Sequence, residues 1–283
     1  MKMKRIIILC LFTGLLLSDT RSWDAHSAYL LPQKRWEMGL FQPFRYGYSE
    51  SIEYSVHPLW FFVMPNFSLK KSQSDFAGFT SASQYKMVYP TPFLNMIAKK
   101  GIPGIIAPDF RMPPMLGLSV SWLMSKNTSG LDLTFKSGLD IGITFEELDF
   151  EALDERSTID LPLVYHRLGI YYNKWGIHTG LDVQKNLTQK FTAVFDLDLI
   201  FLPMTGLAEV QIDPDASKLM GEYSLEHKLL LIWNKSENFR VLTGYKFVMG
   251  EYPYGSDMRL LPYIPMAETW VPIIELQWAR QKR

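Results

Sequence analysis

The chain has 283 residues, of which 47% are hydrophobic and 14% aromatic, with 29 basic and 29 acidic side chains. This balanced charge does not favour a nucleic-acid-binding protein, which would carry a basic excess. The single cysteine, Cys10, lies near the N-terminus, so the remainder of the chain has no thiol for disulfides, thiol catalysis or cysteine metal sites.

Residues 1–22 have the three parts of a secretory signal peptide. A basic start precedes an apolar run over 6–17, and small or polar residues follow it. This run is too short for a transmembrane helix, which needs about 20 apolar residues. We therefore expect export and removal of 1–22, leaving 23–283 as the mature domain. Three cleavage sites fit the pattern: after Ser18, after Ser22 or after Ser27.

Ten later segments are rich in aromatic and β-branched residues and alternate apolar with polar or glycine positions, as strands with two different faces do. In chain order they are 36–46, 51–64, 78–89, 116–124, 131–144, 175–183, 191–201, 223–233, 239–249 and 270–278. The alternation is clearest in 131–144, where odd positions are mostly apolar and even positions carry Asp132, Lys136 and Asp140. A strand of this length exceeds the about 9–11 residues that cross a bilayer.

The connections between these segments are of two kinds. Short, turn-forming connections at 126–130, 186–190 and 234–238 alternate with long ones at 90–114, 145–174, 203–222 and 250–268. This alternation is typical of an up-and-down barrel with short turns at one end and long loops at the other. The stretch 158–173 is either part of a long loop or a further strand with a partner, so the pattern predicts ten to twelve strands.

Aromatic residues gather at both ends of the predicted strands. At the short-turn or C-terminal ends these are Trp122, Phe191, Trp233, Phe239 and Trp278; at the opposite ends they are Tyr89, Phe145, Trp175, Phe201, Tyr223, Tyr252 and Trp270. Two such belts are expected where rings lie at membrane–water interfaces. A soluble β-sandwich would instead place its large aromatics in mid-strand.

With these features the chain resembles the outer-membrane β-barrel proteins of Gram-negative bacteria, and 28–47 resembles the opening of uncharacterised barrel families in that group. The resemblance implies an all-β, antiparallel up-and-down transmembrane β-barrel located in the bacterial outer membrane. It also implies contact with outer-membrane lipid and lipopolysaccharide, and folding by the barrel-assembly machinery. One departure is the end of the chain, which continues beyond the aromatic Trp278 to Arg283.

The polar faces of the strands are predicted to line the barrel interior. The residues chosen as lumen-lining are Asp132, Lys136, Asp140, His178, Asp182, Asp196, Asp198, Arg240 and Lys246, and Glu226, Lys228 and Glu275 belong to the same faces. Their mixed charge does not favour a pore that selects one sign of ion. Two interpretations remain open: a narrow channel or binding site for a small solute, and an interior closed by salt bridges.

We expect no enzyme activity, no cofactor and no metal, because the histidines do not fall at metal-ligand spacings. Two alternatives stay open. The first is a lipid-modifying barrel enzyme near His178, Asp182, Asp196 and Asp198, with Ser119 or Ser121 as a candidate nucleophile. The second is a soluble periplasmic β-sandwich that acts as a binding module.

Overall fold

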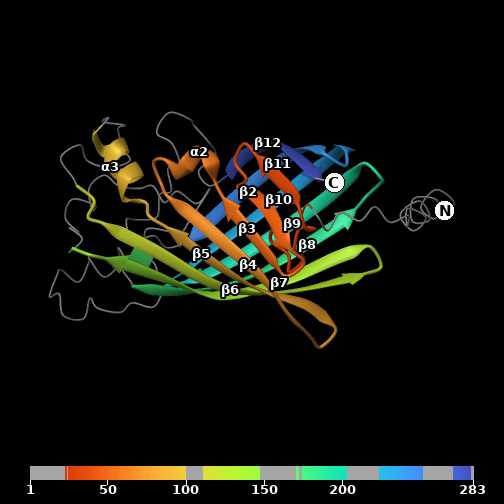
Figure 1. Ribbon diagram of the computed structural model, residues 1–283, viewed down its shortest axis with the longest axis horizontal. Helices are drawn as coiled ribbons and strands as arrows, with labels where there is room; N and C mark the ends of the chain where they lie inside the picture. The colour runs from red at the N-terminus through yellow and green to blue at the C-terminus, as the bar shows by residue number, and fades with distance from the viewer. Residues whose placement is uncertain are drawn as a thin grey trace, which may run out of the picture.

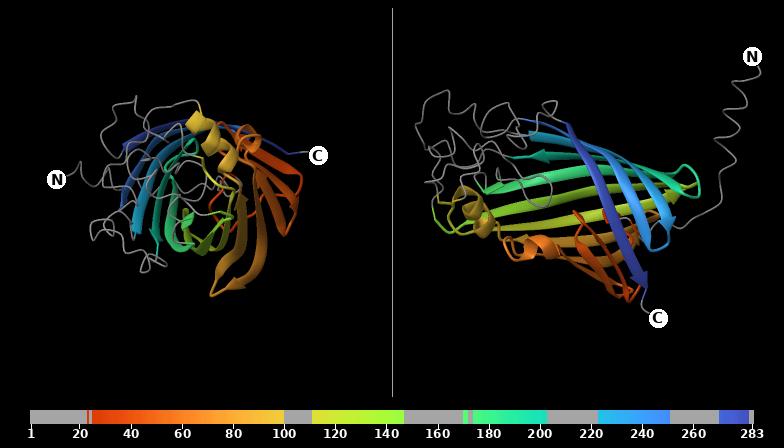
Figure 2. Two further views of the ribbon diagram at one scale, coloured as in Figure 1. Left: turned by 90° about the vertical axis from the view of Figure 1, so that its left-hand side faces the viewer. Right: turned by 90° about the horizontal axis from the view of Figure 1, so that it is seen from above.

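The computed structural model describes residues 23, 25–99, 111–146, 170–171, 174–202, 223–250 and 270–281. These residues form one closed antiparallel barrel of twelve strands, in which chain neighbours pair and β1 also pairs with β12 (Figures 1 and 2). The prediction of an up-and-down barrel is confirmed. The soluble sandwich alternative is wrong, because the first and last strands join and the sheet closes on itself.

Twelve strands and two helices occupy the described ranges. The strands are β1 (Arg35–Gly39), β2 (Phe44–Ser49), β3 (Ile52–Val56), β4 (Asn66–Phe76), β5 (Phe79–Val88), β6 (Met115–Thr128), β7 (Leu131–Thr144), β8 (Trp175–Asn186), β9 (Phe191–Phe201), β10 (Tyr223–Ser236), β11 (Phe239–Gly250) and β12 (Trp270–Gln281). The helices are α2 (Pro58–Phe61) and α3 (Thr91–Lys99).

The upper limit of the predicted strand number is right, but the additional strands lie near the N-terminus. The segment 36–46 is two short strands, β1 and β2, and 51–64 is β3 followed by helix α2. Strand β4 falls between two predicted segments and was not expected. The predicted signal peptide 1–22 and most of 158–173 lie outside the described residues.

The strands predicted most clearly pair along most of their length. Strand β7 pairs with β6 through 14 residue pairs, from Leu131 opposite Thr128 to Thr144 opposite Met115. The turn between them uses Ser129 at φ 53° and Gly130 at φ 81°. The C-terminus lies at this short-turn end of the barrel, whereas α3 lies at the opposite end (Figure 1).

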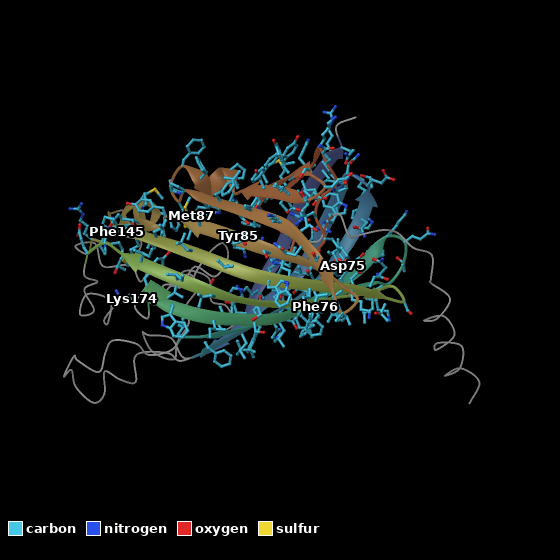
Figure 3. All side chains as sticks on the ribbon, turned by 60° about the horizontal axis from the view of Figure 1, so that its bottom comes forward. Asp75, Phe76, Tyr85, Met87, Phe145 and Lys174 are labelled. Carbon is cyan, nitrogen blue, oxygen red and sulfur yellow. The ribbon has the colours of Figure 1, made fainter. Side chains whose placement is uncertain are left out.

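The two faces of the barrel wall are opposite in polarity to those of a soluble protein. Large apolar side chains on the outer face are exposed, including Tyr85 at 42% and Met87 at 46%, which Figure 3 shows on β5. Charged side chains on the inner face are buried, including Lys70 at 1% and Lys246 at 2%. Apolar groups outside and charges inside are expected when lipid surrounds a strand barrel.

Exposed aromatic rings lie near both ends of the outer face. Phe191 and Trp233 are 39% and 41% exposed at the short-turn end, and Phe145 and Phe201 are 64% and 46% exposed at the opposite end. Trp122 is 46% exposed but lies in mid-strand, because β6 extends to Thr128, beyond the predicted end at 124. Tyr252 lies outside the described residues. Phe191, Trp233, Phe145 and Phe201 therefore follow the two-belt pattern expected from the sequence, whereas the placement of Trp122 in a belt is wrong.

Because strands β1–β3 are short, the β1–β2 turn and helix α2 complete this part of the barrel wall. The buried His57, just before α2, places its Nε2 3.0 Å from the carbonyl oxygen of Phe41 in the β1–β2 turn. Burial lowers the pKa of the His57 imidazole, which favours the neutral ring donating this hydrogen bond. Among the described residues, no helix is long and apolar enough to cross a membrane.

Candidate functional site in the barrel interior

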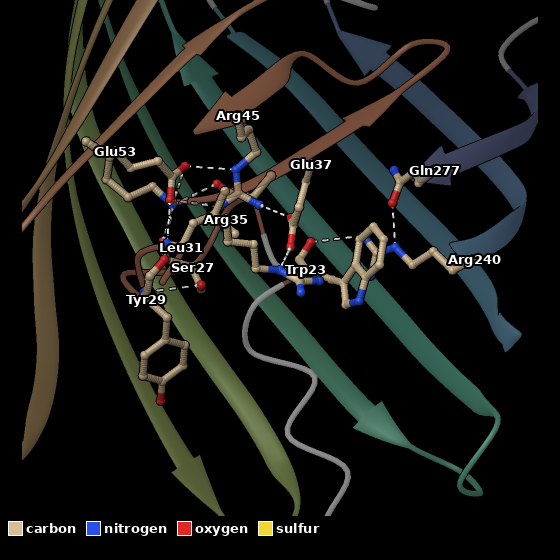
Figure 4. A network of polar contacts seen from close by, with 12 residues as sticks. Trp23, Ser27, Tyr29, Leu31, Arg35, Glu37, Arg45, Glu53, Arg240 and Gln277 are labelled. Carbon is tan, nitrogen blue, oxygen red and sulfur yellow. Dashed lines mark hydrogen bonds and ion pairs between the residues drawn. The ribbon is translucent and has the colours of Figure 1, made fainter. Parts of the chain in front are cut away.

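The N-terminal segment crosses the inside of the barrel. We call Trp23 and residues 25–34 the N-terminal strap (Figure 4). Ala28 is fully buried against Ala82 of β5 and Leu123 of β6, both on inward faces, and its N–H donates to Ser125 Oγ at 2.7 Å. The strap therefore occupies part of the space that an open barrel would leave for solute.

Lys70 of β4 holds the strap by its backbone. The Lys70 side chain is 1% exposed, and its Nζ donates to the carbonyl oxygens of Ala25, Ser27 and Tyr29 at 3.1, 2.9 and 3.4 Å. One ammonium has three N–H donors. These three carbonyls therefore match its full donor capacity and fix the path of the strap.

A row of alternating charges on β1–β3 supports the same segment (Figure 4). The Arg45 guanidinium donates to both carboxylate oxygens of Glu53 at 2.8 and 3.0 Å and to Glu37 at 3.1 Å. Glu53 in turn accepts the Leu31 N–H of the strap at 2.9 Å. Glu37 also accepts from Arg35 at 2.9 Å, so each carboxylate in the row has a cationic partner.

Trp23 fixes the beginning of the strap on the other side of the barrel. The Arg240 guanidinium of β11 lies 4.5 Å from the Trp23 ring centroid and donates to the Trp23 carbonyl oxygen at 2.9 Å. Arg35 approaches the same ring at 5.3 Å. The strap is therefore attached to β1, β3, β4, β6 and β11, around most of the barrel.

The burial of the strap constrains where a signal peptide of the predicted kind would be cut. Cleavage after Ser27 would remove Trp23 together with two of the carbonyl oxygens bound by Lys70. We expect cleavage after Ser18 or Ser22, which leaves these contacts intact. Intact-mass measurement of the protein purified from membranes checks this, and a mature chain beginning at Ala28 would contradict it.

A second charged cluster lies on the inner face of β7–β10. Lys136 Nζ is 3.0 Å from Asp182, 2.6 Å from Asp196 and 2.7 Å from Asp198. Lys228 of β10 adds a second ammonium, 2.6 Å from the other oxygen of Asp196. Five charged side chains from four neighbouring strands therefore form one network of ion pairs, which we call the Lys136 cluster.

The structure places the other lumen-lining candidates on the same inner face. Asp132 accepts from Asn127 at 2.7 Å across the β6–β7 turn, and Lys246 pairs with Glu226. Arg240 pairs with Gln277 and holds the strap. Among the described residues, no group of three or more histidine, cysteine or acidic side chains is arranged to hold a metal ion.

His178 is paired differently from the arrangement considered in the enzyme alternative. Its Nδ1 lies 2.8 Å from Asp140 Oδ2, and its Nε2 lies 3.0 Å from Ser121 Oγ. Asp182, Asp196 and Asp198 belong instead to the Lys136 cluster. The structure thus brings together Ser121, His178 and Asp140 on three successive strands.

The strap and its partners on β2–β4 were not predicted from the sequence, whereas Arg240 was predicted as lumen-lining. Lys70, Arg45 and Glu53 stand on β2–β4, where alternation is weak or interrupted by short strands. The sequence does carry one signal. Charged residues alternate there with apolar neighbours, such as Leu69 beside Lys70 and Tyr46 beside Arg45, and successive residues of a strand face opposite sides. These residues can be identified as inward-facing only once the strand boundaries are known.

Comparison with known proteins adds little to this picture. No protein-family model and no curated protein matches the chain. One similar solved structure is CdiB from Acinetobacter baumannii, at 8% identity and a TM-score of 0.32, covering 87% of this chain and 46% of that protein. The chain thus spans less than half the length of CdiB, and a likeness this weak supports no statement about function.

Proposed function

We propose that this protein is an outer-membrane β-barrel that forms a narrow channel or binding site for a small solute, with its lumen obstructed by its own N-terminal strap. The observation that carries the proposal is the reversed polarity of the closed barrel. Exposed apolar side chains such as Val120 and Phe135 cover its outside, and buried charges such as Lys136 line its inside. Exposed apolar surface on this scale marks contact with lipid or another apolar partner.

The interior supports a small and selective passage. A barrel of twelve strands is narrower than the about 16–18 strands of open porins. The Lys136 cluster and the strap occupy much of that interior with paired charges. The proposed partners are outer-membrane lipid and lipopolysaccharide outside the barrel and the barrel-assembly machinery during folding.

Membrane placement is tested by fractionation. We expect the protein to stay with the membrane pellet after alkaline carbonate, to require detergent for release and to migrate faster on unheated than on heated gels. The physical reason is the apolar outer face, which water does not solvate favourably. Release in the periplasmic fraction without detergent would contradict the proposal.

Solute passage is tested in planar bilayers. We expect small, infrequent conductance steps for the wild-type chain and larger steps when the strap is released. The matched measurement uses Lys70→Met, which loses the strap contacts, against Lys71→Met, whose side chain is exposed on the outer face. Equal conductance of both variants and the wild type would exclude the strap as the obstruction.

A further inference from the structure

We propose that Ser121, His178 and Asp140 form a hydrolytic site on the inner wall of the barrel, with Ser121 as nucleophile for small carboxylic esters that enter the lumen. This activity goes beyond solute passage and does not depend on it. It rests on the order of the contacts: Ser121 Oγ to His178 Nε2 at 3.0 Å, and His178 Nδ1 to Asp140 Oδ2 at 2.8 Å. Serine hydrolases on unrelated folds share this arrangement of nucleophile, base and orienting acid.

The hydrogen bonds determine which ring nitrogen acts as the base. An ionised Asp140 carboxylate can only accept, so the Nδ1 atom of His178 carries the hydrogen. In the neutral ring Nε2 is then an acceptor, and the Ser121 hydroxyl donates to it. This is the tautomer required for a base that withdraws the serine proton.

The fold brings these residues together through the register of three strands. Ser121 pairs with Gly138 on β7, and Gly138 pairs with His178 on β8. A Cβ built on Gly138 would lie 2.5 Å from the His178 ring atoms Cε1 and Nε2. The absence of a side chain at Gly138 therefore lets the imidazole reach across β7 to the serine.

A hydrogen-bond donor stands on the other side of the nucleophile. Gln84 of β5 is the direct cross-strand partner of Ser121, and its Nε2 donates to Ser68 Oγ at 3.3 Å. Directly opposite side chains in a sheet have Cβ atoms about 5 Å apart. The amide nitrogen has two N–H donors, and we assign the one not directed at Ser68 to stabilising negative charge on a substrate carbonyl oxygen.

The position of the site determines the kind of substrate. Ser121 is 3% exposed, whereas the side chains of His178 and Asp140 retain 17% and 13% exposure on the inward face. Access therefore comes from the lumen and not from surrounding lipid. This geometry fits a small, water-soluble ester in place of a membrane phospholipid.

The chemical step balances with water as the only co-reactant. Ser121 Oγ adds to the ester carbonyl carbon while its proton moves to His178 Nε2. The bond to the alcohol oxygen then breaks, and the leaving alkoxide takes that proton. Water then adds to the carbonyl carbon of the acyl-serine and gives a proton to His178 Nε2. When this tetrahedral intermediate breaks down, the proton returns to Ser121 Oγ and the carboxylic acid is released.

The experiment combines active-site labelling with ester hydrolysis on the full chain in detergent. A fluorophosphonate probe is expected to label Ser121, located by peptide mass spectrometry, and p-nitrophenyl acetate is expected to be hydrolysed. Ser121→Ala and His178→Gln should each lower the rate by about 10³-fold or more, and Asp140→Asn by a similar factor. Gln84→Ala should reduce it by about 10²-fold.

Ser137→Ala is the control, because Ser137 is an exposed serine on β7, on the face opposite to Asp140. It should label and hydrolyse like the wild type, and heat-modifiable migration verifies that every variant is folded. To separate access from chemistry, labelling is repeated in Lys70→Met. Absence of label on Ser121 in both the wild type and Lys70→Met, or unchanged hydrolysis by Ser121→Ala, would overturn the proposal while leaving the conductance tests unaffected.

Discussion

Replacing Lys136 with methionine is expected to destabilise the barrel by about 3–5 kcal/mol, the usual cost of removing one partner of a buried ion pair. Methionine keeps most of the volume but removes the ammonium that lies within 3.0 Å of three carboxylates. Within the Lys136 cluster, Lys228 would then be the remaining cation beside three carboxylates. The measurement is urea unfolding in detergent, followed by the loss of heat-modifiable migration.

Lys185→Met is the control for this experiment, because Lys185 is exposed on β8, near the short-turn end of the same strand as Asp182. It should unfold within about 0.5 kcal/mol of the wild type, as surface substitutions usually do. If Lys136→Met unfolded at the same urea concentration as this control, the Lys136 cluster would not stabilise the barrel.

The second large effect is expected for Lys70→Met, which should detach the strap without unfolding the barrel. The substitution removes three charge-assisted hydrogen bonds to backbone carbonyls, each worth about 1.5–3 kcal/mol. A thiol introduced by Ser27→Cys reports on the detachment. Ser27 is fully buried, and the single natural cysteine lies within the segment expected to be removed.

We expect a water-soluble maleimide to react slowly with Ser27→Cys alone and at least about tenfold faster when Lys70→Met is added, which corresponds to about 1.4 kcal/mol of lost protection. Lys71→Met, one residue further along β4 and exposed, should leave the reaction slow. Fast labelling in all three backgrounds would mean that the strap is not held in the barrel by Lys70.

The strands from β6 onward could be predicted from the sequence because successive residues face lipid and lumen in turn. The demands on them are therefore opposite: apolar side chains toward lipid, and polar side chains or glycine toward the lumen. In β7 those demands hold from Leu131 to Thr144 with one exception on the outer face, Ser137. In the N-terminal third they do not. The neighbours Lys70 and Lys71 place charged groups on both faces of β4, and β2 is only six residues long, so the alternation of apolar and polar residues does not locate these two strands.

The interior could be predicted as a set of residues but not as a set of contacts. The parity of each strand shows that His178, Asp140 and Asp182 face inward. Whether His178 lies beside Asp140 or beside another inward residue of β7, such as Lys136, depends on the register between β7 and β8, which side-chain patterning leaves free by steps of two residues. The structure resolves this by pairing Gly138 with His178, which opens the path to Ser121.

The seam between the first and last strands has a consequence for how the protein is assembled. Strand β1 meets β12 through only five residue pairs, whereas β6 and β7 share 14. The strap immediately precedes β1 in the chain and already contacts β3, β4 and β6, so it can settle on the nascent sheet before the circle is complete. Pairing of β1 with β12 would then be the last folding event, and the strap would already lie against the inner face of the sheet when the barrel closes.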